Sequence, residues 1–98
     1  MNKVPVQHIE GLKTKLEYKF TRVEGTTITV CHAFLPNGFM VGVGESACID
    51  PAEFDEDLGR KYAKERAEKD ATITLWQLEG YMLKVTGNLS TDFIHGSA

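Results

Sequence analysis

The hydrophobic and polar positions of the chain predict strands up to about residue 47 and one long helix after residue 50. From Leu16 onward the apolar positions are mostly aromatic or β-branched, and such side chains favour strands because they fit a pleated, half-buried surface. Glu24-Gly25 is the predicted two-residue turn between the first two strands, because glycine tolerates the positive φ that hairpin turns require. The first predicted hairpin therefore pairs residues 16–23 with residues 26–35.

Asn37-Gly38 predicts the second hairpin. This dipeptide, between Phe34-Leu35 and Phe39-Met40, is preferred in a type I′ turn, whose twist matches that of the strands it joins. The register that follows pairs Phe34 with Val41, Leu35 with Met40, Ala33 with Gly42, His32 with Val43 and Val30 with Glu45.

Neither face of the predicted sheet is plainly polar, although a sheet with one covered face should have a polar side. We therefore expect the helix on one face and a second copy of the chain on or beside the other, which makes the protein a homo-oligomer. His32 is interpreted as a core or interface histidine. The apolar positions are Ile28, Val30, Phe34, Val41 and Val43 on one face, and Tyr18, Phe20, Leu35 and Met40 on the other.

The predicted helix begins at a well-marked cap. Asp50 is the capping residue, Pro51 takes the first helical position and Glu53 completes a capping box. Apolar positions then recur every three or four residues, which is typical of one buried helix face. The predicted stripe is Phe54, Leu58, Tyr62 or Ala63, Ala67, Ala71, Leu75, Leu78 and Met82.

Two features leave alternatives open. Thr72-Ile73-Thr74 stiffens the chain, so the helix is either continuous or broken there, with a break leaving residues 75–85 as a second helix. The small residues at 42, 44, 46 and 47 indicate either close approach of the helix to the sheet or a floor for a flat ligand. Gly87-Asn88 is the predicted helix stop.

These patterns place the chain in the α+β class. We expect an N-terminal antiparallel β-meander of about three strands followed by a long C-terminal helix. The predicted organisation is an N-terminal arm over residues 1–14, in which His8 has no assigned role, a single α+β domain over residues 15–86 and a flexible tail over residues 87–98.

Composition narrows the class of protein. The 98 residues are 42% hydrophobic and 26% charged, as in an ordinary globular domain. A net charge of −3 at pH 7 argues against a DNA binder, which needs an extended basic face. No leader sequence and no apolar run of about 20 residues is present, so we expect a cytoplasmic protein without a membrane partner.

The sequence contains no recognisable catalytic or metal-binding pattern, and we expect neither an enzyme nor a cofactor. Cys31 and His32 are neighbours on a strand and so face opposite sides, which prevents a nucleophile pair. Cys48 and Cys31 are interpreted as free thiols. The acidic run 53–57 is interpreted as a solvated helix start.

The remaining candidate chemistry is a nucleotide-binding surface. Arginines grip phosphate in a bidentate manner and aromatic rings stack on bases. Taken one at a time, each of these residue types is more often a surface charge or a core aromatic. The candidates are Arg60, Lys61 and Arg66 on the helix, with Tyr18, Phe20, Arg22 and Phe39 near the hairpin ends.

About two thirds of the chain resembles a family of small tailed-phage proteins. The most specific motifs are Gly44-Glu45-Ser46-Ala47-Cys48 and Leu78-Glu79-Gly80-Tyr81. Asn37-Gly38-Phe39 precedes the first of these motifs and Asp50-Pro51 follows it, which is the order typical of the family. This is the gene-product forty-nine/sixty-six family (N4/Sf6-phage type), with members in a coliphage and a Shigella phage. Residues 71–74 depart from the charged helix typical of that family.

The layout also resembles phage anti-Thoeris sponges, which assemble as oligomers and sequester cyclic ADP-ribose or cyclic nucleotide immune signals without cleaving them. The resemblance implies a site at a subunit interface. There Arg22, Arg60 and Arg66 would hold phosphates, Phe20 and Phe39 would stack on a base, and Asn37 would bond the base edge. The alternatives are a protein-interaction module acting on a host protein or in phage development, and an enzyme that degrades such signals.

Overall fold

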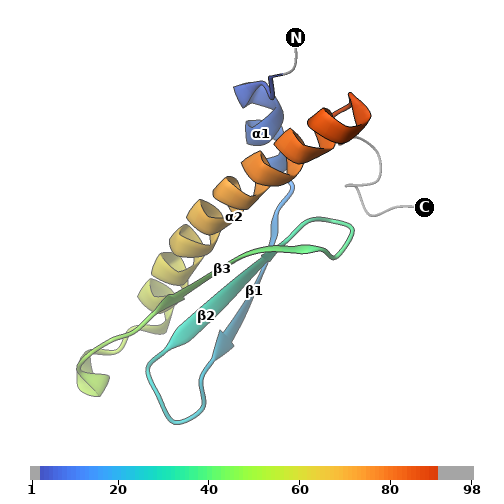
Figure 1. Cartoon of the computed structure of the whole chain (residues 1–98). Helices are drawn as coiled ribbons and strands as arrows, with labels where there is room; N and C mark the ends of the chain where they lie inside the picture. Colours follow the sequence, from blue (N-terminus) through green and yellow to red (C-terminus); the bar gives the residue numbers. More distant parts are fainter. Residues whose placement is uncertain (1–2, 91–98) are drawn as a thin grey trace.

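The computed structural model describes residues 3–90 and has two layers, a three-stranded sheet and one long helix. The elements are α1 (Val6–Lys13), β1 (Glu17–Arg22), β2 (Thr29–Phe34), β3 (Met40–Ser46), a short 3-10 turn η1 (Pro51–Glu53) and α2 (Glu56–Thr86). The strands form an antiparallel meander in the order β1-β2-β3. Helix α2 lies along one face of the sheet (Figure 1), which confirms the α+β prediction.

The turn between β2 and β3 differs from the predicted type I′ turn. That turn needs positive φ at both central residues, but Asn37 does not have it and Gly38 has φ 91°. The loop instead contains three residues, because Gly38 N–H donates to the Leu35 carbonyl at 2.8 Å and Leu35 N–H donates to the Phe39 carbonyl at 2.9 Å. Pro36 before Asn37 explains the change, since its fixed φ suits the first central position of an ordinary turn.

The longer loop shifts the register at one end of the hairpin. Ala33 pairs with Gly42 as predicted, but Phe34 pairs with Met40 instead of Val41. Val41 is the extra residue of a β-bulge, and it and Gly42 are both buried. The predicted pairs of His32 with Val43 and of Val30 with Glu45 are confirmed.

The small residues of β3 and α2 face one another. A Cβ atom added to Gly42 would lie 2.6 Å from the Ala67 carbonyl oxygen, and one added to Gly44 would lie 2.6 Å from the Ala63 oxygen. Ala63, Ala67 and Ala71 are fully buried on the facing side of α2. Of the two readings left open by the sequence, close approach of helix to sheet is therefore the one observed.

The long helix begins later than predicted. Asp50 does act as a cap, because its side chain accepts from Ala52 N–H at 3.0 Å, but it caps only the 3-10 turn. The cap of α2 is Asp55, whose Oδ1 accepts from the N–H groups of Asp57 and Leu58 at 2.9 and 3.2 Å. Two good cap sequences lie five residues apart, and local signals alone do not choose between them.

Helix α2 is continuous through residues 72–74 and ends at Gly87, which has φ 78°. The β-branched residues cost little helix propensity, and buried Ala71 and Leu75 on either side hold this part of the helix against the rest of the fold. The Thr72 hydroxyl donates to the Glu68 carbonyl at 2.7 Å. The predicted stop at Gly87 is confirmed.

The core is smaller than the predicted helix stripe. Leu58, Tyr62 and Leu78 are 39–46% exposed, because the closely packed alanines leave little space for larger side chains between α2 and the sheet. Helix α1 adds Ile9 and Leu12 to the core, beside the C-terminal half of α2 (Figure 1).

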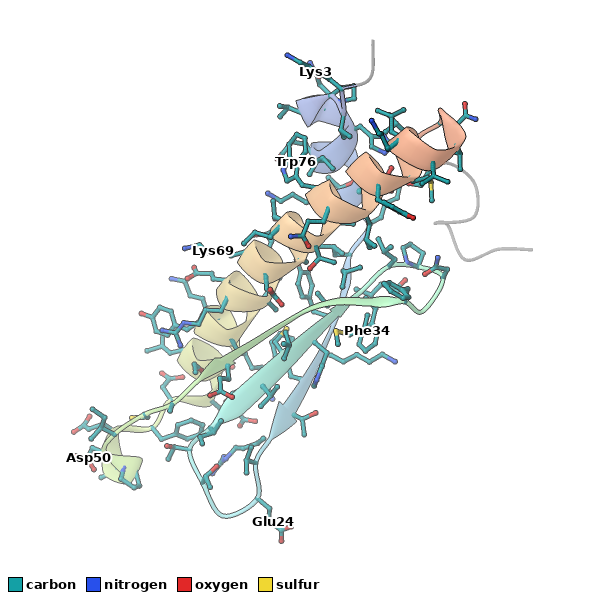
Figure 2. All side chains as sticks on the ribbon, in the orientation of Figure 1. Lys3, Glu24, Phe34, Asp50, Lys69 and Trp76 are labelled. Carbon is teal, nitrogen blue, oxygen red and sulfur yellow. The ribbon has the colours of Figure 1, made fainter. Side chains whose placement is uncertain are left out.

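No helix of residues 3–90 packs on the second face of the sheet. Phe34 points away from α2 (Figure 2), and His32 lies beside it with the two ring centroids 6.3 Å apart. Val43 on the same face is exposed. Homo-oligomer formation stays a prediction, and residues 91–98 of the predicted tail lie outside the described part of the chain.

Candidate functional site

The side of β1 that faces α2 is only partly covered. Helix α2 packs over β3 and β2, so the edge strand β1 carries exposed side chains on both faces. Phe20 pairs with buried Cys31 and therefore lies on the side of the sheet that bears the helix, yet it is 39% exposed. An aromatic ring at this position is available to a ligand.

Three of the six predicted site residues meet beside this strand. Phe20, Arg22 and Arg60 line one hollow of about 70 Å³ together with Thr21, Thr29 and Glu56. We call it the β1 hollow. It joins the end of β1, the start of β2 and the first turns of α2, so residues separated by about 40 positions come together through the fold.

Arg22 is held from two sides without an acidic partner among residues 3–90. Its Nε donates to the Thr26 carbonyl at 3.0 Å, and its guanidinium carbon lies 4.4 Å from the centre of the Phe54 ring. A guanidinium has five N–H donors, so the Nη groups remain to bind an anion. The charge is thus oriented but not neutralised.

Arg60 forms ion pairs on the surface of α2. Its Nη2 lies 2.8 Å from Glu56 Oε1 and its Nη1 lies 3.6 Å from Asp57 Oδ1. All three side chains are about half exposed or more, and exposed pairs of this kind contribute little free energy. A phosphate could therefore replace these carboxylates as the partner of Arg60.

Thr29 lines the hollow, but its hydroxyl faces the helix, since a Cβ added to Gly59 would lie 2.9 Å from Thr29 Oγ1. Thr29 is 3% exposed, and its hydroxyl has no hydrogen-bond partner among residues 3–90. Buried polar atoms without a partner are uncommon and costly. Because this hydroxyl is buried against α2, the donors that the hollow offers to an anionic oxygen group are those of its two arginines.

Tyr18, one of the candidate aromatic residues, and Lys64, which was not a candidate, continue this surface along β1 and α2. Lys64 Nζ lies 4.8 Å from the centre of the Tyr18 ring. Burial, with smaller contributions from Glu68 and Cys31, raises the pKa of Tyr18 to about 12. The signal was available in the sequence, since residues 18, 20 and 22 share one strand face and residues 60 and 64 share one helix face.

The other three predicted site residues lie elsewhere in the single chain. Arg66 Nη1 donates to the Glu45 carbonyl at 2.7 Å, at the outer edge of β3. Asn37 and Phe39 lie at the tip of the β2–β3 hairpin, where Asn37 Oδ1 accepts from Phe39 N–H at 2.9 Å. Because β2 separates that tip from Thr29 by its whole length, one protomer does not bring all six residues into one pocket.

Asn37 and Phe39 border a larger, mostly apolar cavity of about 370 Å³ between the hairpin tip and the C-terminal part of α2. Phe39 is 54% exposed and Tyr81 is 72% exposed. We call this cavity the hairpin pocket. It is lined by Leu35, Asn37, Phe39, Leu78, Glu79, Tyr81, Met82, Val85, Thr86 and Ser90.

One wall of the hairpin pocket contains a buried carboxylate. Glu79 Oε1 lies 2.6 Å from His8 Nε2 and accepts from Ser90 N–H at 2.9 Å. Burial acts to raise the pKa of Glu79, but the hydrogen bonds from Ser90 and His8 outweigh burial and leave the pKa below its usual value. His8, which was given no role from the sequence, therefore holds α1 against α2.

Neither a metal centre nor a membrane span is found in the described part of the chain. Residues 3–90 contain no cluster of three or more His, Cys, Asp or Glu side chains suited to a metal ion. Over the same residues, no helix combines the length and apolar character needed to cross a bilayer. Cys31 and Cys48 are free, the first buried and the second half-buried.

The sequence model described as the phage protein (N4 Gp49/phage Sf6 gene 66) family matches residues 4–86. This match covers most of the chain and confirms the family expected from the motifs at residues 44–48 and 78–81. No curated protein and no solved structure matches the chain significantly.

Proposed function

We propose that this chain, which belongs to the phage protein (N4 Gp49/phage Sf6 gene 66) family, binds and sequesters a nucleotide immune signal in the host cytoplasm. The signal would be a cyclic nucleotide or a molecule of the cyclic ADP-ribose type, held intact. The observation that supports this proposal is the β1 hollow, where Phe20, Arg22 and Arg60 meet.

Each group in the β1 hollow has a distinct role in this proposal. The free Nη donors of Arg22 and the guanidinium of Arg60 bind a phosphate. Phe20 stacks on the attached base, because stacking on an exposed ring suits any planar base. Asn37, Phe39 and Arg66 are not part of this site within one chain.

The test uses purified protein incubated with cyclic ADP-ribose or with a cyclic dinucleotide. After removal of unbound ligand, heat denaturation should release the intact molecule, which mass spectrometry identifies. Retention of neither probe would overturn the proposal. Release of a cleaved product would instead indicate an enzyme that degrades the signal.

Arg22 and Arg66 form a matched pair for locating the site by calorimetry. Arg22→Ala should weaken probe binding about tenfold or more, since a hydrogen bond to a charged group contributes roughly 1.5–3 kcal/mol. Arg66→Ala also removes one positive charge, but Arg66 lies on α2 and donates to the Glu45 carbonyl outside the β1 hollow. This change should therefore alter probe binding by less than about twofold. Loss of binding in Arg66→Ala alone would place the ligand elsewhere.

A second candidate function, binding of a host protein, is favoured by the exposed rings of the hairpin pocket. Phe39 and Tyr81 border an apolar cavity of about 370 Å³, and aromatic residues are common anchors at protein interfaces. Under this function a host protein captured by the wild-type chain should bind again when both are purified. Tyr81→Lys should abolish that binding, whereas Arg22→Ala should not.

A further inference from the structure

The two edges of the sheet differ in what covers them. At the outer edge of β3, Asp70 Oδ2 accepts from Val43 N–H at 3.0 Å and Arg66 Nη1 donates to the Glu45 carbonyl at 2.7 Å. These side chains of α2 occupy backbone groups that would otherwise pair with another strand. Strand addition at β3 would therefore have to displace both side chains.

The outer edge of β1 has no such cover among residues 3–90. Val23 N–H donates to the Ile28 carbonyl at 3.0 Å, which continues the register that pairs Arg22 with Thr29. Hydrogen-bonded and non-bonded pairs alternate along an antiparallel ladder. It follows that Tyr18, Phe20 and Arg22 direct their backbone N–H and C=O groups away from β2, towards the open edge.

We infer that a second copy of this chain pairs its β1 antiparallel to this edge, and that the two β1 hollows then form one symmetric site for a nucleotide carrying two phosphates. This inference rests on the proposed function and assigns the subunit contact and the ligand class. A hollow of about 70 Å³ is far below the roughly 300–1,000 Å³ of a small-molecule pocket, so one chain can hold a phosphate but not the whole nucleotide.

The side chains of β1 select the register of the pair. A two-fold axis perpendicular to the sheet keeps each residue on its own face, so even-numbered residues lie opposite even-numbered residues. An axis at Lys19 would place two lysines directly opposite, which is unfavourable. An axis at Phe20 lets Tyr18, Phe20 and Arg22 of both chains form about six backbone hydrogen bonds across the contact. The same axis places Arg22 opposite the partner's Tyr18, which is a favourable cation–aromatic pair.

This dimer would have one six-stranded sheet with both α2 helices on the same face. With neighbouring strands about 4.8 Å apart and helices about 10 Å across, the axes would be roughly 20 Å apart and the cleft between them roughly 10 Å wide. Its floor would carry Tyr18, Phe20 and Arg22 of both chains, and its walls Arg60 and Lys64 of both. A cyclic dinucleotide carries two phosphates and two planar bases, and cyclic ADP-ribose carries two phosphates and one planar base, so both suit this cleft.

The mass of the protein in solution tests the contact. The wild-type chain should have twice its 10.9 kDa mass by light scattering across a dilution series. Phe20→Lys would place two charges face to face at the axis and should give the monomer. Phe39→Lys, which changes an exposed aromatic ring at the hairpin tip, should remain dimeric.

A monomeric wild type, or a Phe20→Lys chain that remains dimeric, would overturn the inference. Circular dichroism checks that Phe20→Lys is folded. If it is not, Phe20→Cys in a Cys48→Ser chain tests the same contact, since directly opposite residues lie within disulfide range. An interchain disulfide should form there and not with Phe39→Cys, and its absence would equally overturn the contact.

Calorimetry with each of the two probes separates this inference from the proposed function. One ligand per two chains is expected, with binding lost in Phe20→Lys and retained in Phe39→Lys. A dimer that binds neither probe would overturn the proposed function and the ligand class but leave the β1 contact in place. A monomer that binds one ligand per chain would overturn the shared site and leave the proposed function standing.

Discussion

His8 Nε2 lies 2.6 Å from Glu79 Oε1 although 71 residues separate them in the sequence. The same carboxylate oxygen accepts from Ser90 N–H at 2.9 Å. One buried side chain of α2 therefore holds both α1 and the segment that follows α2. Because a buried charge that loses its partners is costly, these contacts should determine how firmly the two ends of the described chain attach to α2.

The first prediction concerns acid stability. The folded-state pKa of Glu79 is lowered, so its contribution to stability is present above the unfolded value of about 4.5 and is lost as the pH falls through the folded value. Glu79→Gln should be less stable than wild type by about 1–3 kcal/mol at pH 7. Urea titrations between pH 7 and 3 should show a smaller loss of stability for the variant than for wild type.

Glu10→Gln is the control for this measurement, because Glu10 pairs with Lys13 on the surface of α1 and is well exposed. It should follow the wild-type pH dependence. Equal pH dependence in Glu79→Gln and wild type would show that Glu79 does not control acid stability.

The second prediction concerns the contact between β3 and α2. Gly42→Ala would place a Cβ 2.6 Å from the Ala67 oxygen and 2.7 Å from the Ala71 nitrogen, and neither backbone atom can move without displacing the helix. We expect a loss of about 3 kcal/mol in the free energy of unfolding, measured by chemical denaturation.

Gly80→Ala is the matched control within α2. A Cβ there meets nothing within 4 Å, and alanine favours the helix, so this change should stabilise the protein by about 0.5–1 kcal/mol. A Gly42→Ala chain as stable as wild type would contradict the close approach of α2 to β3.

The third prediction compares the two caps. Asp55→Ala should destabilise the protein by about 1 kcal/mol, because Asp55 satisfies two N–H groups at the start of a 31-residue helix. Asp50→Ala removes one bond in a single 3-10 turn and should cost less than half as much. The reverse order in thermal denaturation would favour the helix start predicted from the sequence.

The fourth prediction concerns the covered edge of β3. Asp70→Ala should expose the Val43 N–H, which now donates to Asp70 Oδ2, and should speed its hydrogen exchange while costing about 1–3 kcal/mol. Lys69→Ala, a change at the adjacent position of α2, should leave that exchange rate unchanged. Unaltered protection of Val43 in Asp70→Ala would mean that another group covers this edge.

Local sequence accounts for the class and order of the elements. Gly38 and Gly25 mark the two hairpin turns, and each has positive φ in the fold, as the turn chemistry requires. Gly87 ends α2 for the same reason. The predicted two-residue turn at Glu24-Gly25 is nevertheless wrong, because Val23 pairs with Ile28 and leaves a four-residue loop. Local sequence did not predict the type of the β2–β3 turn, because Pro36 and Asn37-Gly38 favour loops of different length. A change of one residue in loop length shifts the strand register.

For the candidate site, the sequence supplied the residue types but only the fold supplied their grouping. Phe20, Arg22 and Arg60 meet because α2 lies over β3 and β2 and leaves the inner side of β1 partly open. Arg66, on the same helix, reaches the opposite edge of the sheet. Helical spacing gives the direction of a side chain but not which sheet edge it meets.

The sequence by itself therefore determined a β-meander followed by a long helix, since period-two and period-three-to-four patterns act over a few residues. Only the tertiary structure decided that α2 is unbroken, that Asp55 begins it and that Glu79 joins His8 to Ser90. It also decided that α2 covers the edge of β3 and leaves that of β1 open. These outcomes depend on contacts between residues far apart in the chain, whose free energies exceed the small local preferences at the same positions.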